Sequence, residues 1–518
     1  MNLLGRLLKG QSEEESEAQL DGLAEPALEP NFRYEEIPDT LDLGWYWSEG
    51  KKEFQMAKIS EEDRATHTYI IGASGTGKTR FLEHLILQDI VEKKGFGVID
   101  PHGDLIEEVK GWVSLHYGSQ FLSERVVLVD PTAPDFTVTF NPLEVLDGVS
   151  PAEQSAELVE VFKKIWGASW GARMEDLLRN SFIALAENRL TLLELPYLLT
   201  EWQFRDKVME RVKHPISKQY FSRFDNLAQR TRQEWIESTM NKVNAFLSDD
   251  RVRRMLSRPG SSFNLREIMD EGKVLLVKLE KGSLKDNAYL LGSLLMAKIQ
   301  MAAFSRTDLP QGKRRRFYLY IDEFQDFATE SFIETLGEAR KYGLCLIMAH
   351  QNLTQLPRRL QDSILTNCGI QVYFRVSRED AEGLAKEGFE TTAREIKGIR
   401  SEFEYDYYTY SEEWERYFQE LQTLPRRCCY VKHKIEGGMI PITTPEVPFP
   451  WKVLGIEEDE YPAFLRSLPI GKKYLLPAGE LEIESKIRID EIVAEERVEP
   501  KSFRQPKKTK ARKPSRRP

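Results

Sequence analysis

One glycine-rich loop constrains this chain more than any other feature. Residues 72–79 have the sequence GASGTGKT and fit the pattern G-x-x-x-x-G-K-[ST]. The β-branched and aromatic run 68–71 indicates a buried strand before the loop, and the apolar spacing of residues 80–87 indicates a helix after it. This context distinguishes a phosphate-binding loop from a glycine turn with a stray lysine. We therefore expect the loop to bind a nucleoside triphosphate.

The residues of this loop have separate expected roles. Glycines let backbone N–H groups close around phosphate oxygens, and the start of the following helix adds partial positive charge. The Lys78 ammonium can reach the β- and γ-phosphates, while the Thr79 hydroxyl can bind Mg²⁺. A nucleoside triphosphate and Mg²⁺ are thus the ligands that the loop predicts. The predicted nucleotide contacts are Gly72, Ala73, Ser74, Gly75, Thr76, Gly77, Lys78, Thr79 and Arg80.

A second strand, far along the chain, ends in two acids. The apolar run 317–321 is followed by Asp322 and Glu323. An acid at the tip of such a strand holds Mg²⁺ through water, so we assign Asp322 to the metal together with Thr79. Glu323 is the candidate general base for the attacking water. Asp-Glu after an apolar strand also occurs by chance, and the pairing with the loop at 72–79 favours the functional interpretation.

A third predicted strand, 343–349, is followed by His350 and Gln351. A polar residue that closes the next parallel strand lies beside the γ-phosphate in sheets of this kind. We therefore predict that Gln351 senses hydrolysis, with a helix cap as the alternative. No second His or Cys lies at metal-site spacing from His350, so we expect His350 to pack or to face solvent.

Several motifs in fixed order resemble one known family. The segments GASGTGKT, VIDPHGDL, DPTAPDFTVTFNPLE, WGARMEDLLRN, IDEFQDFAT, EARKYGL and AHQ resemble the HerA/FtsK superfamily of P-loop ATPases, and within it the TraG/TraD-like coupling proteins of type IV secretion systems. The resemblance covers residues 40–445. It implies an α/β fold, namely a RecA-like P-loop NTPase with a doubly wound, mostly parallel sheet and an inserted all-α domain.

The same resemblance implies a function. It is that of an ATP-hydrolysing ring motor, a homo-hexamer, that moves DNA or a protein–DNA conjugate. The expected partners are DNA, single- or double-stranded, and secretion-system or relaxase-type proteins. One alternative is a type IV-like ATPase that energises protein secretion or assembly without threading DNA. A nucleotide-gated scaffold without turnover is the other alternative.

In such a ring, an arginine from the neighbouring subunit completes the catalytic site. Arg340, in the segment before the predicted sensor strand, is the first candidate. Arg375, after the apolar run 372–374, is the second, and Arg173 is the third. Any of the three can instead pair with a local carboxylate, which is the commoner role of a surface arginine.

The composition is that of a globular protein, with 41 % hydrophobic and 30 % charged residues. Four cysteines, two of them adjacent, do not make a disulfide framework, which favours a reducing compartment. The longest apolar stretch, 288–304, is interrupted by Lys298, and we expect a buried helix there rather than a membrane span. Coupling proteins usually carry N-terminal membrane helices, and we find no stretch of that kind in this sequence. This difference from the family puts a membrane-bound role in doubt. We expect a cytoplasmic protein, with residues 1–9 either a small amphipathic anchor for peripheral contact at the inner face of the cell membrane or a frayed terminus.

These landmarks divide the chain into predicted regions. They are a disordered acidic segment (1–30), a small β entry element (31–65), the first half of the NTPase domain (66–150), the inserted all-α domain (151–260), the second half of the NTPase domain (261–400), a C-terminal part that closes the core (401–490) and a disordered basic tail (491–518). The net charge of −10 argues against a protein that coats nucleic acid over its whole surface, but it is compatible with a motor whose DNA contacts are confined to a pore. The basic tail is either a sequence-independent phosphate contact or a solubilising extension.

Overall fold

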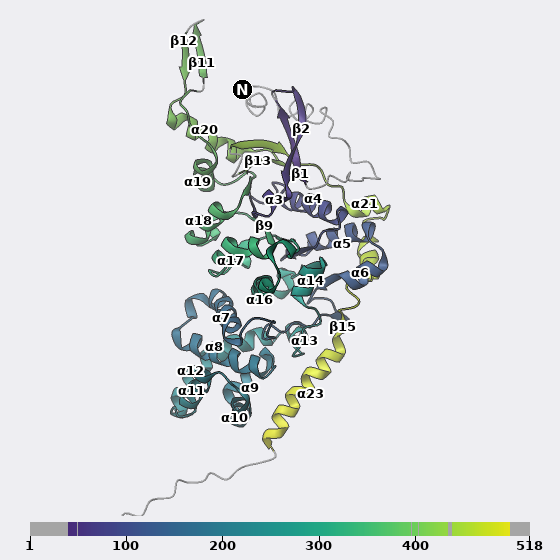
Figure 1. The fold of residues 1–518 in the computed structure, drawn as a ribbon, viewed down its shortest axis with the longest axis vertical. Helices are drawn as coiled ribbons and strands as arrows, with labels where there is room; N and C mark the ends of the chain where they lie inside the picture. Colours follow the sequence, from purple (N-terminus) through teal and green to yellow (C-terminus); the bar gives the residue numbers. More distant parts are fainter. Residues whose placement is uncertain (1–39, 49, 395, 402–403, 434–437, 498–518) are drawn as a thin grey trace, which may run out of the picture.

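A central sheet of eleven strands organises the molecule (Figure 1). The computed structural model describes residues 40–48, 50–394, 396–401, 404–433 and 438–497. The predicted acidic segment 1–30, the candidate anchor 1–9 and the basic residues from 501 onward lie outside the described residues. The strand order is β2-β1-β14-β13-β10-β3-β9-β8-β4-β7-β5.

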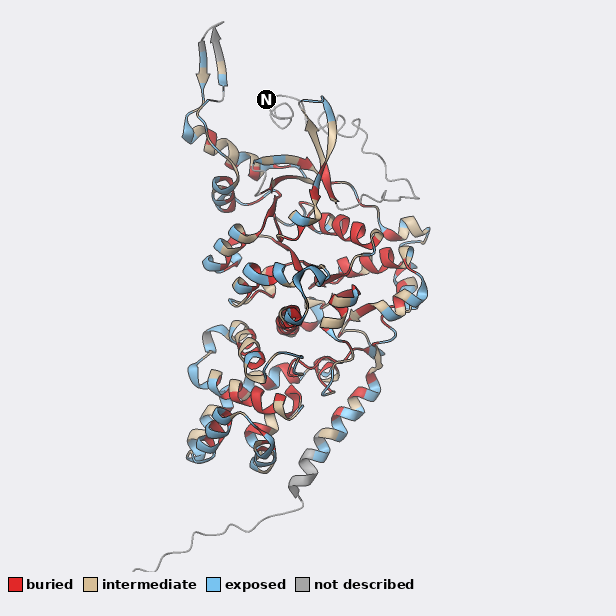
Figure 2. Ribbon diagram, viewed as in Figure 1, coloured by how far each residue is buried: buried red, intermediate tan, exposed pale blue. Residues whose placement is uncertain are grey.

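Seven neighbouring strands of this sheet run parallel. In spatial order they are β10 (Ile370–Tyr373), β3 (Thr68–Ile71), β9 (Leu344–His350), β8 (Phe317–Ile321), β4 (Phe96–Asp100), β7 (Val274–Lys278) and β5 (Val126–Val129). Nearly all of their residues are buried, as expected of parallel strands with both faces covered. Figure 2 shows these strands as the buried centre of the molecule. The predicted doubly wound, mostly parallel sheet is confirmed.

Alternate side chains of the parallel strands belong to two hydrophobic cores. Ile70, Val98 and Tyr320 pack in one core with helices α4 (Lys78–Val91) and α5 (Asp104–His116). Their neighbours in sequence, Tyr69, Ile99 and Leu319, belong to the other core. That second core contains residues of α14 (Leu265–Glu271), α16 (Asp286–Phe304), α17 (Phe332–Glu338), α18 (Arg358–Asn367) and α19 (Arg378–Gly388). The period-2 alternation of strand side chains therefore produces the two helical layers.

Helix α16 is the apolar segment that the sequence singles out at 288–304. Among the described residues, one helix, Asp286–Asp308, has the length and hydropathy of a membrane span, and 89 % of its apolar window is buried inside the fold. Leu291, Leu294 and Leu295 pack in the core of the sheet domain. The expectation of a buried helix is confirmed.

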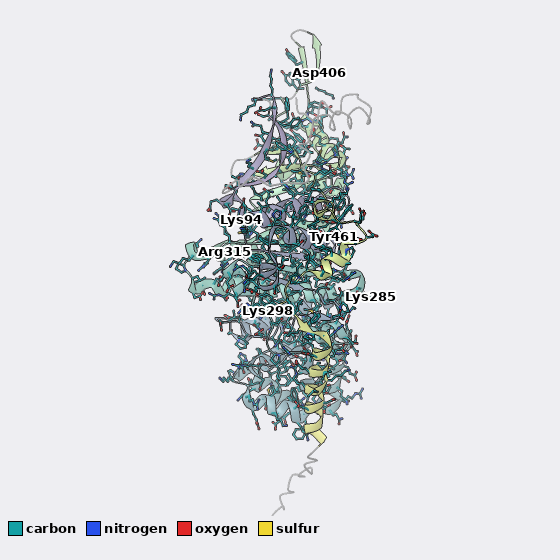
Figure 3. All side chains as sticks on the ribbon, turned by 90° about the vertical axis from the view of Figure 1, so that its right-hand side faces the viewer. Lys94, Lys285, Lys298, Arg315, Asp406 and Tyr461 are labelled. Carbon is teal, nitrogen blue, oxygen red and sulfur yellow. The ribbon has the colours of Figure 1, made fainter. Side chains whose placement is uncertain are left out.

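Four antiparallel strands extend the sheet beyond β10. They are β13 (Cys428–His433), β14 (Met439–Thr443), β1 (Thr40–Ser48) and β2 (Glu53–Ser60). The strands of the predicted entry element thus continue the main sheet instead of forming a separate unit. Between β10 and β13 the chain also forms a hairpin of β11 (Ile396–Ser401) and β12 (Glu404–Tyr407), followed by α20 (Tyr410–Thr423). The hairpin projects from one end of the molecule, where Figure 3 labels Asp406.

A helical region lies on the other side of the sheet domain from this hairpin (Figure 1). It corresponds to the predicted insertion 151–260. Its helices are α7 (Pro151–Trp166), α8 (Ala172–Glu187), α9 (Leu195–Thr200), α10 (Trp202–Arg211), α11 (Pro215–Asp225), α12 (Gln229–Leu247) and α13 (Asp250–Met255). Smaller elements complete the fold: α3 (Glu61–Arg64), α6 (Ser119–Arg125), β6 (Phe136–Thr137), α15 (Lys281–Leu284), α21 (Pro450–Leu454), α22 (Tyr461–Ser467) and β15 (Leu476–Pro477).

Helix α23 (Ala478–Arg497) runs from the sheet domain along the helical region. Arg258 makes a two-pronged ion pair with Glu484, at 2.6 and 2.8 Å, and Arg488 pairs with Glu194 at 2.6 Å. The predicted start of the disordered tail at residue 491 falls inside this helix. Residues 491–497 are mostly good helix formers without proline or glycine, which explains why the helix continues.

A buried ion pair links α3, α4 and the sheet. Arg64 donates to Asp89 at 2.6 Å and to the Tyr320 hydroxyl at 2.7 Å, and that hydroxyl donates to Asp89 at 2.6 Å. The two charged side chains are 1 % and 0 % exposed. Each charge therefore depends on the other for compensation.

We expect Asp89→Ala to lower the free energy of unfolding by about 3–5 kcal/mol, because it leaves the Arg64 charge buried without its partner. Urea unfolding measures this change. The matched control is Glu234→Ala, which breaks an exposed pair with Arg230 and should change stability by less than about 1 kcal/mol. Equal effects of the two substitutions would contradict the buried-pair argument.

Candidate active site

The predicted site residues follow adjacent strands at one edge of the sheet. Strands β3, β9 and β8 are neighbours, and their register pairs Ile71 with His350 and Ile321 with Met348. The loop after β3, Gln351 after β9 and Asp322 after β8 therefore leave the sheet at the same edge. Ligands of open α/β sheets bind at this carboxyl edge.

The glycine loop has the backbone that its sequence predicts. Gly75 and Gly77 have φ values of +77° and +110°, which favour glycine. A Cβ on Gly72 would lie 2.5 Å from the Cβ of Phe374, so only glycine fits beside β10. Two main-chain contacts hold the loop from outside: Ala73 N–H donates to the Arg375 carbonyl at 2.7 Å, and Arg427 N–H donates to the Thr76 carbonyl at 2.9 Å. The contact with Arg427 was not predicted from the sequence.

Lys78 is the first residue of α4, and its side chain folds back over the loop. Its Nζ donates to the carbonyls of Gly72 at 2.6 Å and Ala73 at 3.0 Å. Burial lowers the pKa of Lys78, while the carboxylates of Asp322 and Glu323 act in the opposite direction. The structure thus brings a buried amine, the loop amides and two acids together.

Asp322 lies against the start of α4. One of its oxygens accepts from the Thr79 hydroxyl at 3.3 Å, and the other accepts from the Glu323 N–H at 3.0 Å. Burial, with the nearby carboxylates of Asp100 and Glu323, raises the pKa of Asp322 to about 7, although Lys78 opposes this rise. A bound dication would reverse that rise.

The residues around Asp322 fit a magnesium ion. A hydroxyl and a carboxylate that already touch supply hard oxygen ligands of the kind that Mg²⁺ prefers. Within the described part of the chain, no three His, Cys, Asp or Glu side chains cluster as metal ligands. The remaining ligands would therefore be phosphate oxygens and water. Asp100, the last residue of β4, is buried close to Asp322, and its charge adds to the rise in the pKa of Asp322.

Glu323 combines a strained backbone with a fixed side chain. Its φ of +48° places a non-glycine residue in the left-handed region, at a cost of roughly 1–2 kcal/mol, and such strain clusters at functional sites. The side-chain amides of Gln351 and Gln325 donate to its two carboxylate oxygens, at 2.6 and 2.7 Å. Burial alone would raise the pKa of Glu323, but these hydrogen bonds, assisted by Lys78, lower it. The carboxylate therefore stays ionised, as a proton acceptor requires.

His350, the last residue of β9, and Gln351, the residue after it, have different surroundings. The Gln351 amide contacts Glu323 in the site. The alternative role, a cap for the following helix, belongs to Asn352, where a short turn begins and whose N–H donates to the Gln355 side chain at 3.2 Å. His350 is buried, and its ring shares a hydrogen bond with the Tyr69 hydroxyl at 2.6 Å. Burial lowers the pKa of His350 to about 4, so the ring is neutral and packs inside the fold.

The arginines lie in four different surroundings. The Arg80 guanidinium pairs with Glu83 at 2.5 Å and lies 4.1 Å above the Phe449 ring, a partner that the sequence does not predict. Arg375 follows β10 at the site edge and is exposed. Arg340 is also exposed, but it precedes β9 and so lies at the opposite edge, about 20 Å along the strand from Gln351. The third candidate, Arg173, lies in α8 over the ring of Trp235.

Comparison with known proteins identifies similar sequences and folds. A family model described as "Type IV secretion-system coupling protein DNA-binding domain" matches residues 54–393. No curated protein matches this chain. The structure is similar to the plasmid coupling protein TrwB in complex with the ATP analogue ADPNP, with a TM-score of 0.53 and 17 % identity over 80 % of this chain and 97 % of TrwB.

Two further solved structures share the fold. TrwB in complex with ADP and Mg²⁺ has a TM-score of 0.53 and 16 % identity, over 76 % of this chain and 87 % of TrwB. VirB4 of Thermoanaerobacter pseudethanolicus has a TM-score of 0.51 and 13 % identity, over 80 % of this chain and 98 % of VirB4. At these identities the likeness shows the fold, and it confirms the predicted RecA-like architecture.

We expect Lys78→Ala to weaken ATP binding by about 100-fold, because the charge-assisted hydrogen bonds of the ammonium to the phosphates are lost. Isothermal titration with ATP and Mg²⁺ measures the affinity. Lys51→Ala, at an exposed lysine in the turn between β1 and β2, is the control and should bind as the parent does. Parent-like affinity of the Lys78→Ala variant would remove this lysine from the phosphate site.

Proposed function

We propose that this chain, which belongs to the family of the type IV secretion-system coupling protein DNA-binding domain, is an ATP-hydrolysing motor that moves DNA or a protein–DNA conjugate through a ring of identical subunits. One observation carries the proposal of hydrolysis. The ionised Glu323 carboxylate is held by two amides at the same sheet edge as Lys78 and Asp322. Structures of TrwB contain an ATP analogue, ADP with Mg²⁺ and a GTP analogue, and the first two support ATP as the substrate.

In the proposed cycle, the loop amides and Lys78 hold the phosphates. Thr79 and Asp322 hold Mg²⁺, which when bound neutralises charge on the β- and γ-phosphates. Glu323 accepts a proton from the attacking water, and the two amides that hold its carboxylate fix the direction from which it does so. Gln351 contacts Glu323 on one side and is proposed to contact the γ-phosphate on the other, so that release of phosphate changes its hydrogen bonds.

A neighbouring subunit is proposed to complete the site. Arg340 is exposed at the edge of the sheet opposite to its own loop, where its guanidinium is available to another chain. In a homo-hexameric ring, that edge of one subunit would face the site of the next. Arg375, the second candidate, lies beside the glycine loop of its own chain, and from there it would act on the nucleotide of its own subunit. An arginine that neutralises charge in the transition state is worth about 10³-fold or more in rate.

DNA is the proposed cargo because the matching family is defined by a DNA-binding domain. With a net charge of −10, contacts with the phosphate backbone would be confined to a limited surface such as a pore. The likeness in fold to VirB4 supports a second candidate function, an ATPase that energises secretion or assembly without threading DNA. Stimulation by DNA distinguishes the two candidates.

We expect ATP hydrolysis by the parent chain to rise when single- or double-stranded DNA is added, because a translocase couples turnover to its track. Phosphate release with each DNA and without DNA measures this. A rate that no DNA changes would favour the secretion ATPase. Absence of release under all conditions would favour a nucleotide-gated scaffold.

We expect Glu323→Gln to bind ATP normally and to lower kcat by about 10²–10⁴-fold, because the amide cannot accept the proton. Phosphate release and nucleotide titration measure the two properties. The control is Glu330→Gln, at an exposed glutamate after β8, which should hydrolyse ATP at the parent rate. Turnover of the Glu323→Gln variant at the parent rate would move the base to another residue.

We expect Arg340→Ala to bind ATP and assemble but to hydrolyse poorly. Mixing it with the Glu323→Gln variant should restore some activity, because mixed rings contain interfaces where an intact glutamate faces an intact arginine. Phosphate release by the mixture, with assembly checked by mass measurement, tests this. If the mixture stays inactive although both variants assemble together, Arg340 does not act across the interface.

A further inference from the structure

One side chain of the helical region reaches the segment that carries the candidate base. Lys164, near the end of α7, is partly buried. Its Nζ donates to the main-chain carbonyls of Asp326 at 2.8 Å and Gln325 at 3.3 Å. These two residues belong to the short 3₁₀ turn Phe324–Asp326, which starts directly after Glu323. The helical region and the catalytic edge of the sheet thus meet at this lysine.

A single residue connects Lys164 with the candidate base. The Gln325 carbonyl accepts from Lys164, while the Gln325 side-chain amide donates to Glu323 at 2.7 Å. The Gln325 Oε1 atom is buried and accepts no hydrogen bond from the described residues. The direction of this amide is therefore set by its own main chain and by Glu323. Moving the main chain at Gln325 would move the amide that holds the base.

Lys164 and Gln325 both line two cavities. A cavity of about 410 Å³ is lined by Lys164 and Gln325 together with residues such as Arg359. A second cavity, of about 920 Å³, is lined by the same two residues and, among others, Lys242 and Asp326. Phe324, at the start of the turn, is fully buried against the Phe332 ring, and Lys281 pairs with Asp326 at 3.7 Å. Gln325 and Asp326 are only partly buried and both line the larger cavity, and Lys164 holds their carbonyls.

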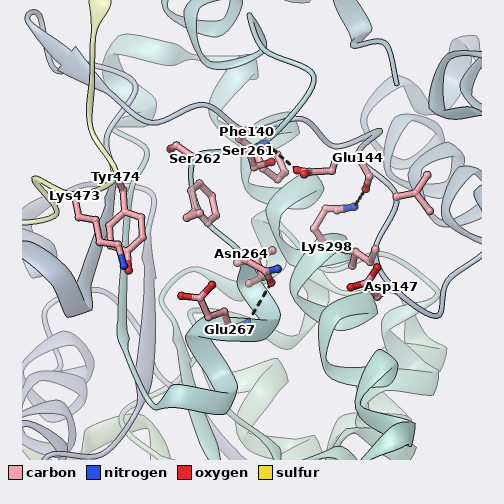
Figure 4. A pocket seen from close by; sticks show the side chains of 14 residues that line it. Phe140, Glu144, Asp147, Ser261, Ser262, Asn264, Glu267, Lys298, Lys473 and Tyr474 are labelled. Atoms are coloured by element: carbon pink, nitrogen blue, oxygen red, sulfur yellow. Dashed lines mark hydrogen bonds between the residues drawn. The ribbon is translucent and has the colours of Figure 1, made fainter. Parts of the chain in front are cut away.

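The other end of α7 is anchored differently. There, Lys298 of α16 donates to the Gln154 side chain of α7 at 3.0 Å and to the Glu144 carbonyl at 2.5 Å. Lys298 and Gln154 are both fully buried in the described fold. Figure 4 shows Lys298 directed at Glu144 on the wall of a cavity of about 460 Å³. The start of α7 is thus fixed by buried polar contacts, and Val161 and Phe162 near its end also pack in the core. At that end, Lys164 makes the polar contact with the segment after Glu323.

We propose that Lys164 is a positioning residue for ATP hydrolysis. It holds the Gln325–Asp326 main chain so that the Gln325 amide orients Glu323. Turnover thereby depends on the position of the helical region. This inference rests on the proposed function and names a control point of the same site. Lys164 touches neither nucleotide nor water in this account and acts through Gln325.

The test begins with Lys164→Met. Burial already lowers the pKa of Lys164 to about 7, and Asp326 only partly opposes this, so an apolar side chain of similar length is compatible with folding. We expect the affinity for ATP and the KM to stay within about twofold of the parent and kcat to fall about tenfold, the upper range for residues that couple two sites. Lys164→Arg keeps donors for both carbonyls and should restore most of the rate. The matched control is Lys163→Met, because Lys163 is exposed and pairs only locally with Glu160.

A second substitution tests the route through Gln325. We expect Gln325→Leu to lower kcat as well, and the double variant with Lys164→Met to be no slower than the slower single variant, because both changes interrupt one path. Lys164→Met with the kcat of the parent, or fully additive losses in the double variant, would overturn the inference while leaving the proposed function intact. A parent chain without any turnover would instead overturn the proposed function, and this inference with it.

Discussion

The parallel pairing of β3, β9 and β8 fixes where the chemistry of this molecule can occur. Thr79 and Asp322 are separated by 243 positions in the sequence, yet their side chains meet at 3.3 Å because the two strands that precede them share β9 as a neighbour. A shift of one residue in this register would turn every strand side chain to the opposite face of the sheet. The two hydrophobic cores, which need alternate side chains on opposite faces, therefore also protect the site geometry.

Electrostatics then separates the roles of the two adjacent acids. Asp322 is deeply buried beside Asp100 and Glu323, and these neighbours favour a bound cation. Glu323 receives two amide hydrogen bonds that keep it ionised. Environments that shift the pKa values of two carboxyl groups in opposite directions are typical of sites where the two groups have different catalytic roles. In the proposed function, the division is between holding a metal and accepting a proton.

Most of the strands and the loop could be predicted from the sequence, because their signals are local. The apolar runs, the glycine pattern and the polar residue at each strand end need no knowledge of distant contacts. The role of Gln325 could not be predicted, since it depends on the left-handed backbone of Glu323 and on Lys164 from another region. The contact of Arg427 with the loop likewise depends on how β13 pairs with β10. The sequence also does not show that the Arg80 guanidinium pairs with Glu83 and lies over the Phe449 ring.

A structure determined with an ATP analogue and Mg²⁺ tests the central claim most directly, namely that the edge formed by β3, β9 and β8 is the hydrolytic site. The account predicts that Mg²⁺ binds the Thr79 hydroxyl at about 2.1 Å, with Asp322 in its coordination shell directly or through water. It also predicts a water between the γ-phosphate and the Glu323 carboxylate, within hydrogen-bond reach of that carboxylate. A nucleotide bound at this edge with Glu323 remote from the γ-phosphate, or bound elsewhere in the molecule, would contradict the account.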